Sequence, residues 1–86
     1  MDQAQSGTRY IIQVDRPGQT LDMPAVRNLL EATGIRLDTS YGPILIDRKL
    51  GRYVVRGVGT PEARAKAEQI PGIRLFADTR QQPLSR

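Results

Sequence analysis

Apolar and polar residues alternate along several stretches of this chain, and a period of two is typical of a β-strand with one buried face. In the first stretch, Tyr10, Ile12 and Val14 share one face and the residues between them share the other. The Gly-Pro pair at 42–43 predicts a bend before the short apolar run 44–46, and 47–51 is typical of a hairpin turn. We predict four strands, over 8–14, 35–41 continued by 44–46, 52–58 and 73–78.

Two other stretches place their apolar residues three and four positions apart, which is the spacing of one face of a helix. The first covers about 11 residues between Asp22, a capping residue, and Gly34, which suits a left-handed C-cap. The second covers 62–70 and follows Thr60 and Pro61, a capping residue and a proline suited to the first helical position. We therefore predict two helices, each lying between strands.

The order strand, helix, strand, strand, helix, strand predicts an α+β fold of the ferredoxin-like βαββαβ type. Right-handed crossovers place both helices on one face of a four-stranded antiparallel sheet and leave the other face open. The chain has 86 residues, which is too few for two hydrophobic cores. We expect a flexible leader at 1–7, a single domain over 8–78 and a C-terminal tail at 79–86.

Composition argues against an enzyme. The chain contains no cysteine and no histidine, so it lacks the usual imidazole base and the residues of the common nucleophile pairs and metal sites. Asp38 and Asp47 flank the predicted bend, but no other oxygen ligands cluster with them in the sequence. We expect no catalytic residue, no metal and no cofactor.

The charge is basic. Thirteen Lys and Arg residues against nine Asp and Glu residues give a formal net charge of +4, and eleven of the thirteen are arginine, which favours carboxylate or phosphate partners. No apolar stretch approaches the roughly 20 residues that span a bilayer, and residues 1–7 lack the features of a signal peptide. We expect no membrane association and a cytoplasmic location for the chain as written, or an extracellular one if it is expressed as part of a larger precursor.

Four segments carry a resemblance to a known family. The first strand shows an aromatic, Ile, Val pattern over 9–14, and 51–55 combines a glycine, an aromatic residue and valines. An alanine-rich helix then ends in the Ile-Pro-Gly-Ile turn at 70–73, and the last strand ends at the acidic residue Asp78. In these features, which extend over most of the chain, the sequence resembles the subtilisin propeptides and the related peptidase inhibitors of the I9 type.

The resemblance implies a non-catalytic protein-binding module. In that family the open sheet face lies against two surface helices of a subtilisin-like serine protease, and the C-terminal tail occupies the active-site cleft in a product-like way. By this resemblance we expect a protein partner of that class, contacted through strand residues Tyr10, Ile12, Tyr53, Val55, Arg74, Phe76 and Asp78. The inhibitory tail would comprise Gln81, Gln82, Pro83, Leu84, Ser85 and Arg86.

Two alternative functions for an open sheet face remain: RNA binding and self-association. Tyr10 and Tyr53 are expected to be adjacent in the middle of the sheet, where RNA-recognition motifs stack bases on aromatic rings, and the positive charge suits RNA. Against this, the stretch 50–58 lacks the second aromatic residue and the glycine spacing of that motif. Alternatively, the open face pairs with a second copy of the chain and makes a homodimeric assembly module.

Overall fold

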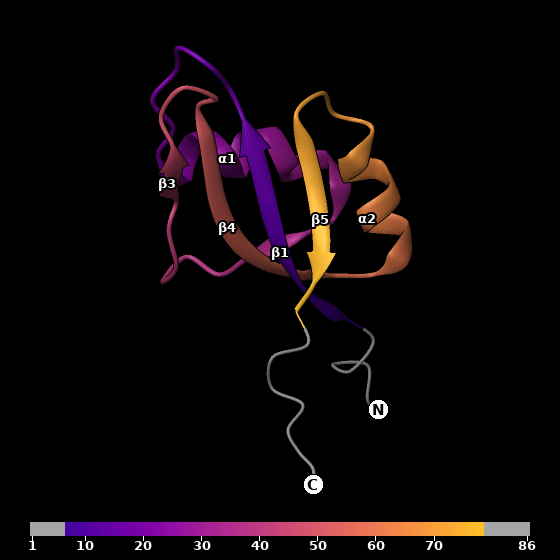
Figure 1. Ribbon diagram of the computed structural model, residues 1–86. Helices are drawn as coiled ribbons and strands as arrows, with labels where there is room; N and C mark the ends of the chain where they lie inside the picture. Colours follow the sequence, from indigo (N-terminus) through magenta and orange to yellow (C-terminus); the bar gives the residue numbers. More distant parts are fainter. Residues whose placement is uncertain (1–6, 79–86) are drawn as a thin grey trace, which may run out of the picture.

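The computed structural model describes residues 7–78 of the chain. Both α-helices lie on one side of a β-sheet, and β1 begins at the end of the sheet where β5 ends (Figure 1). Neither helix in this range is long and apolar enough to cross a membrane. A 3-10 helix, Glu31–Thr33, follows α1 directly. The other elements, in chain order, are β1 (Thr8–Asp15), α1 (Met23–Leu30), β2 (Arg36–Leu37), β3 (Ile44–Asp47), β4 (Arg52–Gly59), α2 (Pro61–Glu68) and β5 (Ile73–Ala77).

Both helices begin where the sequence predicts, because each has a side chain that caps its first turn. The Asp22 carboxylate accepts a hydrogen bond from the Ala25 amide at 3.0 Å, and the Thr60 hydroxyl accepts one from the Ala63 amide at 3.1 Å. Gly34 adopts a φ of 91°, which lets the chain leave the first helical segment in the left-handed conformation. The predicted caps at both starts and the predicted glycine stop are confirmed.

The sheet is antiparallel throughout. Its strand order is β2-β4-β1-β5, and β3 also pairs with β4. The two central strands, β1 and β4, pair along their whole length, from Thr8 opposite Gly59 to Asp15 opposite Arg52. The predicted α+β class with a ferredoxin-like arrangement is confirmed, with five strands in the described part of the chain where the sequence predicts four.

The fifth strand arises because the predicted second strand is divided. Only two residues of the predicted stretch 35–41 pair with β4. Beyond them the Asp38 carboxylate accepts a hydrogen bond from the Ser40 amide at 3.0 Å, and Gly42 adopts a φ of 75°, so the chain turns away from the sheet. It returns as β3, which pairs with the other half of β4. A continuous strand over 35–41 is therefore wrong, whereas the predicted bend is confirmed.

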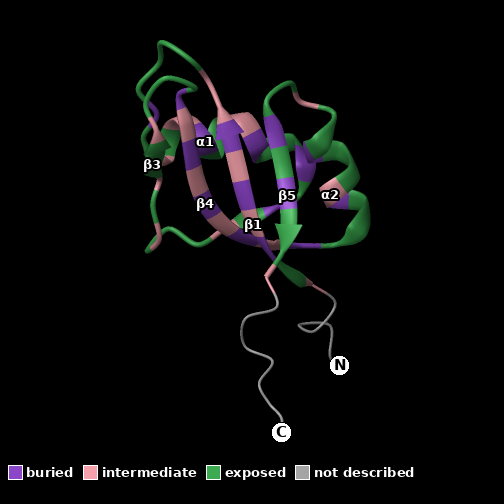
Figure 2. Cartoon of the chain, viewed as in Figure 1, coloured by how far each residue is buried: buried purple, intermediate pink, exposed green. Residues whose placement is uncertain are grey.

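The hydrophobic core lies between the sheet and the two helices. Buried and partly exposed positions alternate along β4 and along most of β1, because each strand turns every second side chain toward the helices (Figure 2). Helix α2 contributes two small residues, Ala63 and Ala67, to this layer. The buried apolar residues are Tyr10, Ile12, Val14, Leu21, Val26, Leu30, Ile35, Tyr53, Val55, Ala63, Ala67, Ile73 and Leu75.

Candidate functional site

All five strands turn side chains toward the face of the sheet that no helix covers, which is called the open face below. The strand register aligns these side chains in rows across the sheet, and Asp38 and Asp78 continue the rows beyond the ends of β2 and β5 through backbone hydrogen bonds. The rows, starting where β1 begins, are Arg36, Val58, Arg9 and Asp78; Asp38, Arg56, Ile11 and Phe76; Ile44, Val54, Gln13 and Arg74; and Asp47, Arg52 and Asp15.

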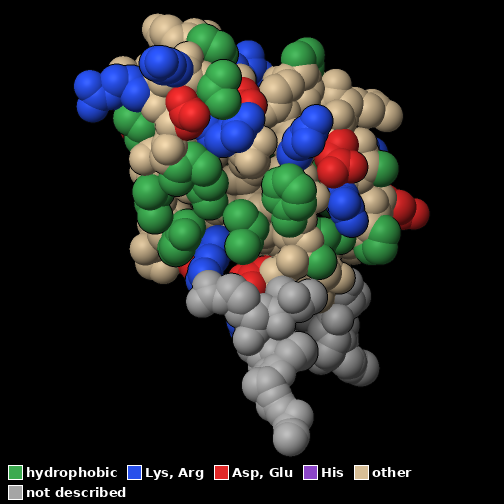
Figure 3. Space-filling view, viewed as in Figure 1, with side chains coloured by type: hydrophobic (Ala, Val, Ile, Leu, Met, Phe, Trp, Pro, Cys, Tyr) green, Lys and Arg blue, Asp and Glu red, His purple; other side chains and the backbone are tan. Residues whose placement is uncertain are grey.

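Five side chains in these rows, Ile11, Ile44, Val54, Val58 and Phe76, form what we call the apolar patch. Ile11 lies opposite Phe76, and Ile44 lies opposite Val54. The side chains of Phe76 and Ile44 are the most exposed of the five, at 47% and 44%, and the other three are half-buried. Figure 3 looks onto the open face and shows hydrophobic side chains spread across it with charged side chains between and around them.

A charged pair, Arg52 and Asp15, occupies the row farthest from the start of β1. Nε of Arg52 lies 2.8 Å from Oδ1 of Asp15, and Nη2 lies 2.9 Å from Oδ2. The hydrogen bonds from Arg52 lower the pKa of Asp15, partial burial opposes this, and the charges of Arg52 and Arg74 add to the lowering. The same hydrogen bonding raises the pKa of Arg52. At neutral pH both groups are therefore ionised and offset each other's charge.

A second cation, Arg56, is held in place by its neighbours on the open face. Its guanidinium carbon lies 4.4 Å from the centre of the Tyr41 ring, and its Nε lies 3.9 Å from Oδ2 of Asp78. That Nε is buried and has no hydrogen-bond acceptor among residues 7–78. Hydrogen bonds from the Ser40 hydroxyl and amide lower the pKa of Asp38, and the Arg56 charge makes a smaller contribution. Both acidic residues near Arg56 thus already have interactions.

Three more arginines of the open face, Arg9, Arg36 and Arg74, are exposed. Within residues 7–78 none of the three forms an ion pair or a side-chain hydrogen bond. Arg9 and Arg36 lie on either side of Val58, and Arg74 lies two positions before Phe76 on β5. The apolar patch is therefore bordered by cations that no carboxylate in the described part of the chain pairs with.

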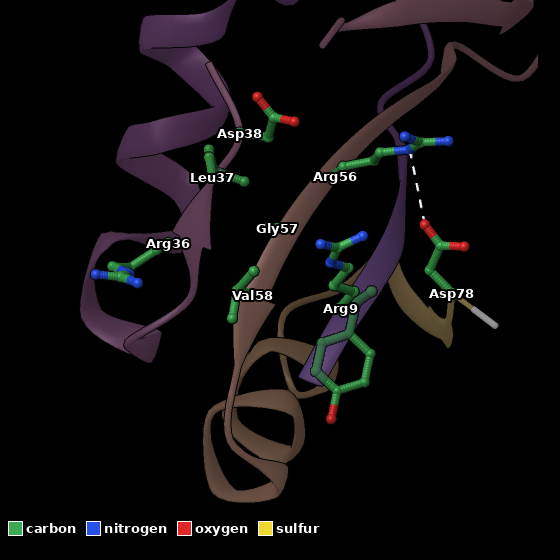
Figure 4. A pocket seen from close by; sticks show the side chains of 9 residues that line it. Arg9, Arg36, Leu37, Asp38, Arg56, Gly57, Val58 and Asp78 are labelled. Carbon is green, nitrogen blue, oxygen red and sulfur yellow. Dashed lines mark ion pairs between the residues drawn. The ribbon is translucent and has the colours of Figure 1, made fainter. Parts of the chain in front are cut away.

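Where β1 begins, the open face contains a hollow of about 500 Å³. Arg9, Arg56 and Asp78 lie on one side of it, and Arg36 and Asp38 lie on the other (Figure 4). In residues 7–78 no three side chains of His, Cys, Asp or Glu come together in a way that would hold a metal ion. This space is called the arginine-lined hollow below.

Four of the residues expected to contact a partner lie in the core. Tyr10, Ile12, Tyr53 and Val55 are 3%, 0%, 7% and 0% exposed, and they face the helices. Their predicted place on a docking face is wrong, because the sheet turns its larger apolar set toward the covered side. The hydroxyl of Tyr53 donates to the carbonyl of Gln19 at 3.3 Å, so the ring is buried while its polar end has a partner. Both tyrosine rings are consequently covered and cannot serve as a stacking surface for RNA bases.

Three of the expected residues, Arg74, Phe76 and Asp78, do lie on the open face, beside Ile11 and Arg9. The tail residues 81–86 lie outside the described range, so the predicted inhibitory tail is not placed by the structure. The prediction missed Ile11, whose signal in the sequence is an apolar residue on the polar face of the first strand. It also missed the rest of the apolar patch, which becomes evident only through the strand register.

Comparisons with known proteins identify no relative of this chain. No family model matches the chain, and no match is found among the curated proteins or among the solved structures. The functional argument therefore depends on the open face and on the sequence features described above.

Proposed function

We propose that this chain is a non-catalytic module that binds a partner protein through the open face of its sheet. The observation that carries the proposal is the apolar patch, which five side chains from four strands build beside unpaired arginines. Contiguous exposed apolar surface with a polar rim is typical of interaction sites. Aromatic residues and arginine are enriched in protein interfaces, and the patch combines Phe76 with neighbouring arginines.

The open face is also rigid enough to present this patch in one arrangement. Ile11 and Val54 belong to the central strands β1 and β4, each of which is paired on both sides, and the core lies directly behind them. A partner therefore meets a surface whose backbone is already ordered, which reduces the entropy lost on association. Phe76, the most exposed aromatic residue of the face, is the side chain best placed to enter a partner's pocket.

For the class of partner, the proposal follows the sequence resemblance to propeptides and inhibitors of subtilisin-like serine proteases. The open face would lie against the protease surface, and residues 81–86 would enter its active-site cleft. The segments that carry the resemblance include 9–14 and 70–73, which in the structure form most of β1 and the turn that leads into β5. Residues 9–14 alternate between the core and the open face, so the choice of partner class rests on the sequence resemblance.

The test adds the purified full chain to a panel of subtilisin-like proteases and measures hydrolysis of a chromogenic peptide. We expect inhibition, and we expect Phe76→Glu and Ile11→Glu each to weaken it by roughly a hundredfold, because a buried unpaired carboxylate costs several kcal/mol in an interface. Ala65→Glu places the same charge on an exposed position of α2, on the far side of the sheet, and should inhibit like the parent chain. Deletion of 81–86 tests the tail separately.

The same variants decide between this proposal and its two rivals. If no protease of the panel is bound or inhibited, the proposed partner class is excluded. Salt-dependent binding of single-stranded RNA that Phe76→Glu abolishes would instead assign the face to nucleic acid. A dimer in sedimentation velocity that Phe76→Glu converts to monomer would assign it to self-association.

A further inference from the structure

The hollow at the start of β1 brings together three arginines from three different strands. Arg9 lies on β1, Arg36 on β2 and Arg56 on β4, and all three line a space of about 500 Å³. Val58 lies between Arg9 and Arg36 in the strand register and provides an apolar wall. Figure 4 shows the Arg9 and Arg56 side chains on the same side of the β4 ribbon and Arg36 on the other side, with its guanidinium group directed away from them.

The two acidic residues of the hollow do not neutralise all of its positive charge. Asp78 lies within 3.9 Å of Arg56, and the Asp38 carboxylate accepts hydrogen bonds from the Ser40 amide and hydroxyl. Neither Arg9 nor Arg36 has an ion pair or side-chain hydrogen bond within residues 7–78. The hydrogen bonds from Ser40 leave the negative charge of Asp38 in place, so three cations and two anions give the lining a net charge of +1.

The Nε atom of Arg56 is a further hydrogen-bond donor without an acceptor among residues 7–78. The Tyr41 ring and the Asp78 carboxylate hold its guanidinium in position, while its buried Nε has no hydrogen-bond acceptor in the described part of the chain. Because that Nε is buried, a group that enters the hollow would meet the exposed guanidinium groups of Arg9 and Arg36, and Arg56 would contribute its positive charge.

We propose that the hollow is a carboxylate-binding site, and that the carboxylate belongs to an acidic side chain on the surface of the partner protein. The first part depends only on the lining: planar guanidinium groups bind carboxylates through paired hydrogen bonds, and Val58 suits the methylene groups of a glutamate side chain. The second part rests on the proposed function, because the hollow opens on the same face as the apolar patch. A free small oxyanion is the rival source of the same chemistry.

The first experiment uses no partner. The ¹⁵N-labelled full chain is titrated with N-acetyl-glutamate methylamide, with its glutamine counterpart and with inorganic phosphate, at constant ionic strength. We expect saturable shifts of the Arg9, Arg36 and Arg56 Nε resonances and of the Val58 amide with the glutamate probe alone. Arg9→Gln and Arg36→Gln should each weaken binding by roughly tenfold, while Arg27→Gln, an exposed arginine on α1, should leave it unchanged.

Three outcomes would overturn the proposal. Shifts that grow linearly with concentration, or a dissociation constant for the glutamate probe that Arg9→Gln leaves unchanged, would show general salt effects rather than a site. Tighter binding of phosphate than of the glutamate probe would assign the hollow to free oxyanions. Because no partner is present, these results are independent of whether the open face binds a protease.

The second experiment tests the source of the carboxylate. With a protease that the parent chain inhibits, Arg9→Gln should weaken inhibition by roughly tenfold and make it less dependent on salt, whereas Arg27→Gln should change neither. An unchanged inhibition constant in Arg9→Gln would show that the partner's carboxylate does not enter the hollow. Absence of any inhibition by the parent chain would instead exclude the proposed function and leave the glutamate titration as the measure of the site.

Discussion

Arg52 and Asp15 join the two central strands of the sheet by two parallel hydrogen bonds, 2.8 Å and 2.9 Å long, at the end of the open face opposite the arginine-lined hollow. The two residues are 37 positions apart in the chain, so the pair forms only when β1 and β4 meet in the native register. Both side chains are partly exposed, at 31% for Arg52 and 27% for Asp15. The ion pair therefore depends on the assembled sheet and not on the structure of any local segment.

The first prediction concerns the pH dependence of stability. Arg52 holds the pKa of Asp15 below its ordinary value of 3.8, whereas the unfolded chain titrates at the ordinary value. Because the folded pKa is lowered, this contribution is present above about pH 4 and is lost as the pH falls through the folded pKa. We expect Asp15→Asn to lower the melting temperature at pH 6 and to converge with the parent chain in stronger acid.

Circular dichroism melts between about pH 2 and pH 7 measure this convergence. Glu31→Gln, at an exposed glutamate that has no ion pair within residues 7–78, is the control and should stay close to the parent chain throughout. A melting-temperature difference for Asp15→Asn that is the same at every pH would contradict the role assigned to the ion pair.

The second prediction separates a core tyrosine from a surface phenylalanine. Tyr53 is 7% exposed, and its truncation to alanine would leave a cavity between the sheet and the helices. We expect Tyr53→Ala to reduce the free energy of unfolding by about 3 kcal/mol, as large-to-small changes in cores do. Phe76→Ala, at 47% exposure on the open face, should cost less than about 1 kcal/mol. Urea denaturation gives both values, and equal losses in the two variants would place both rings in the same environment.

Local signals in the sequence predicted the elements well because each depends on a few neighbouring residues. Asp22 and Thr60 cap the first turns of the helices through bonds three residues away, and Gly34 ends the first helical segment by its own backbone conformation. The alternating pattern likewise predicted β1, β4 and β5. These interactions need no knowledge of the rest of the chain, and the order of elements then limits the fold to few arrangements.

The composition of the open face was harder to predict because it depends on register. Alternation shows that Tyr10 and Ile11 lie on opposite faces, but it does not show which face the helices cover. Only the pairing of Ile11 with Phe76, and of Tyr10 with Ala77, settles which residues of β1 and β5 share a face. The prediction combined Phe76 with Tyr10 in one site, although the register separates them.

The division of the second strand was also not predicted. Its sequence alternates like a strand, but hydrogen bonds to one side chain, Asp38, form a turn there instead. Leu37, Thr39 and Tyr41 alternate with polar residues, yet the Asp38 carboxylate accepts hydrogen bonds from Ser40 and turns the chain. Tyr41 ends up over the guanidinium of an arginine on β4 rather than in the sheet. The turn begins at Asp38, which also lines the arginine-lined hollow.

The third prediction concerns the close approach of β2 to β4. A Cβ atom added at Gly57 would lie 2.9 Å from the Arg36 carbonyl oxygen, 2.9 Å from Cγ2 of Ile35 and 3.2 Å from Cδ1 of Ile12. Backbone and core atoms cannot give way as freely as a flexible side chain. We expect Gly57→Ala to cost about 1–3 kcal/mol in the free energy of unfolding. Thr8→Ala, at an exposed position of β1, is the control in the same urea experiment, and a loss no larger than that of the control would contradict the close packing.

The last prediction concerns the outer edge of β5, which helix α2 closes with two side chains. Oε2 of Glu68 accepts a hydrogen bond from the Leu75 amide at 3.3 Å, and Nη2 of Arg64 donates to the Leu75 carbonyl at 3.1 Å. Both backbone groups of that edge residue are thereby paired, whereas an unpaired edge is a template for another strand. We expect Glu68→Ala to lower stability by about 1 kcal/mol and to speed hydrogen exchange of the Leu75 amide.

Glu68→Gln is the matched control for this edge, because its amide oxygen still accepts the hydrogen bond while its charge is lost. Exchange at Leu75 should stay slow in Glu68→Gln and become fast in Glu68→Ala, which separates edge closure from the exposed ion pair with Arg64. Light scattering at increasing concentration should show association of Glu68→Ala through the opened edge. If both variants exchange equally fast, the charge rather than the hydrogen bond closes the edge, and if neither changes, the edge is protected by something other than α2.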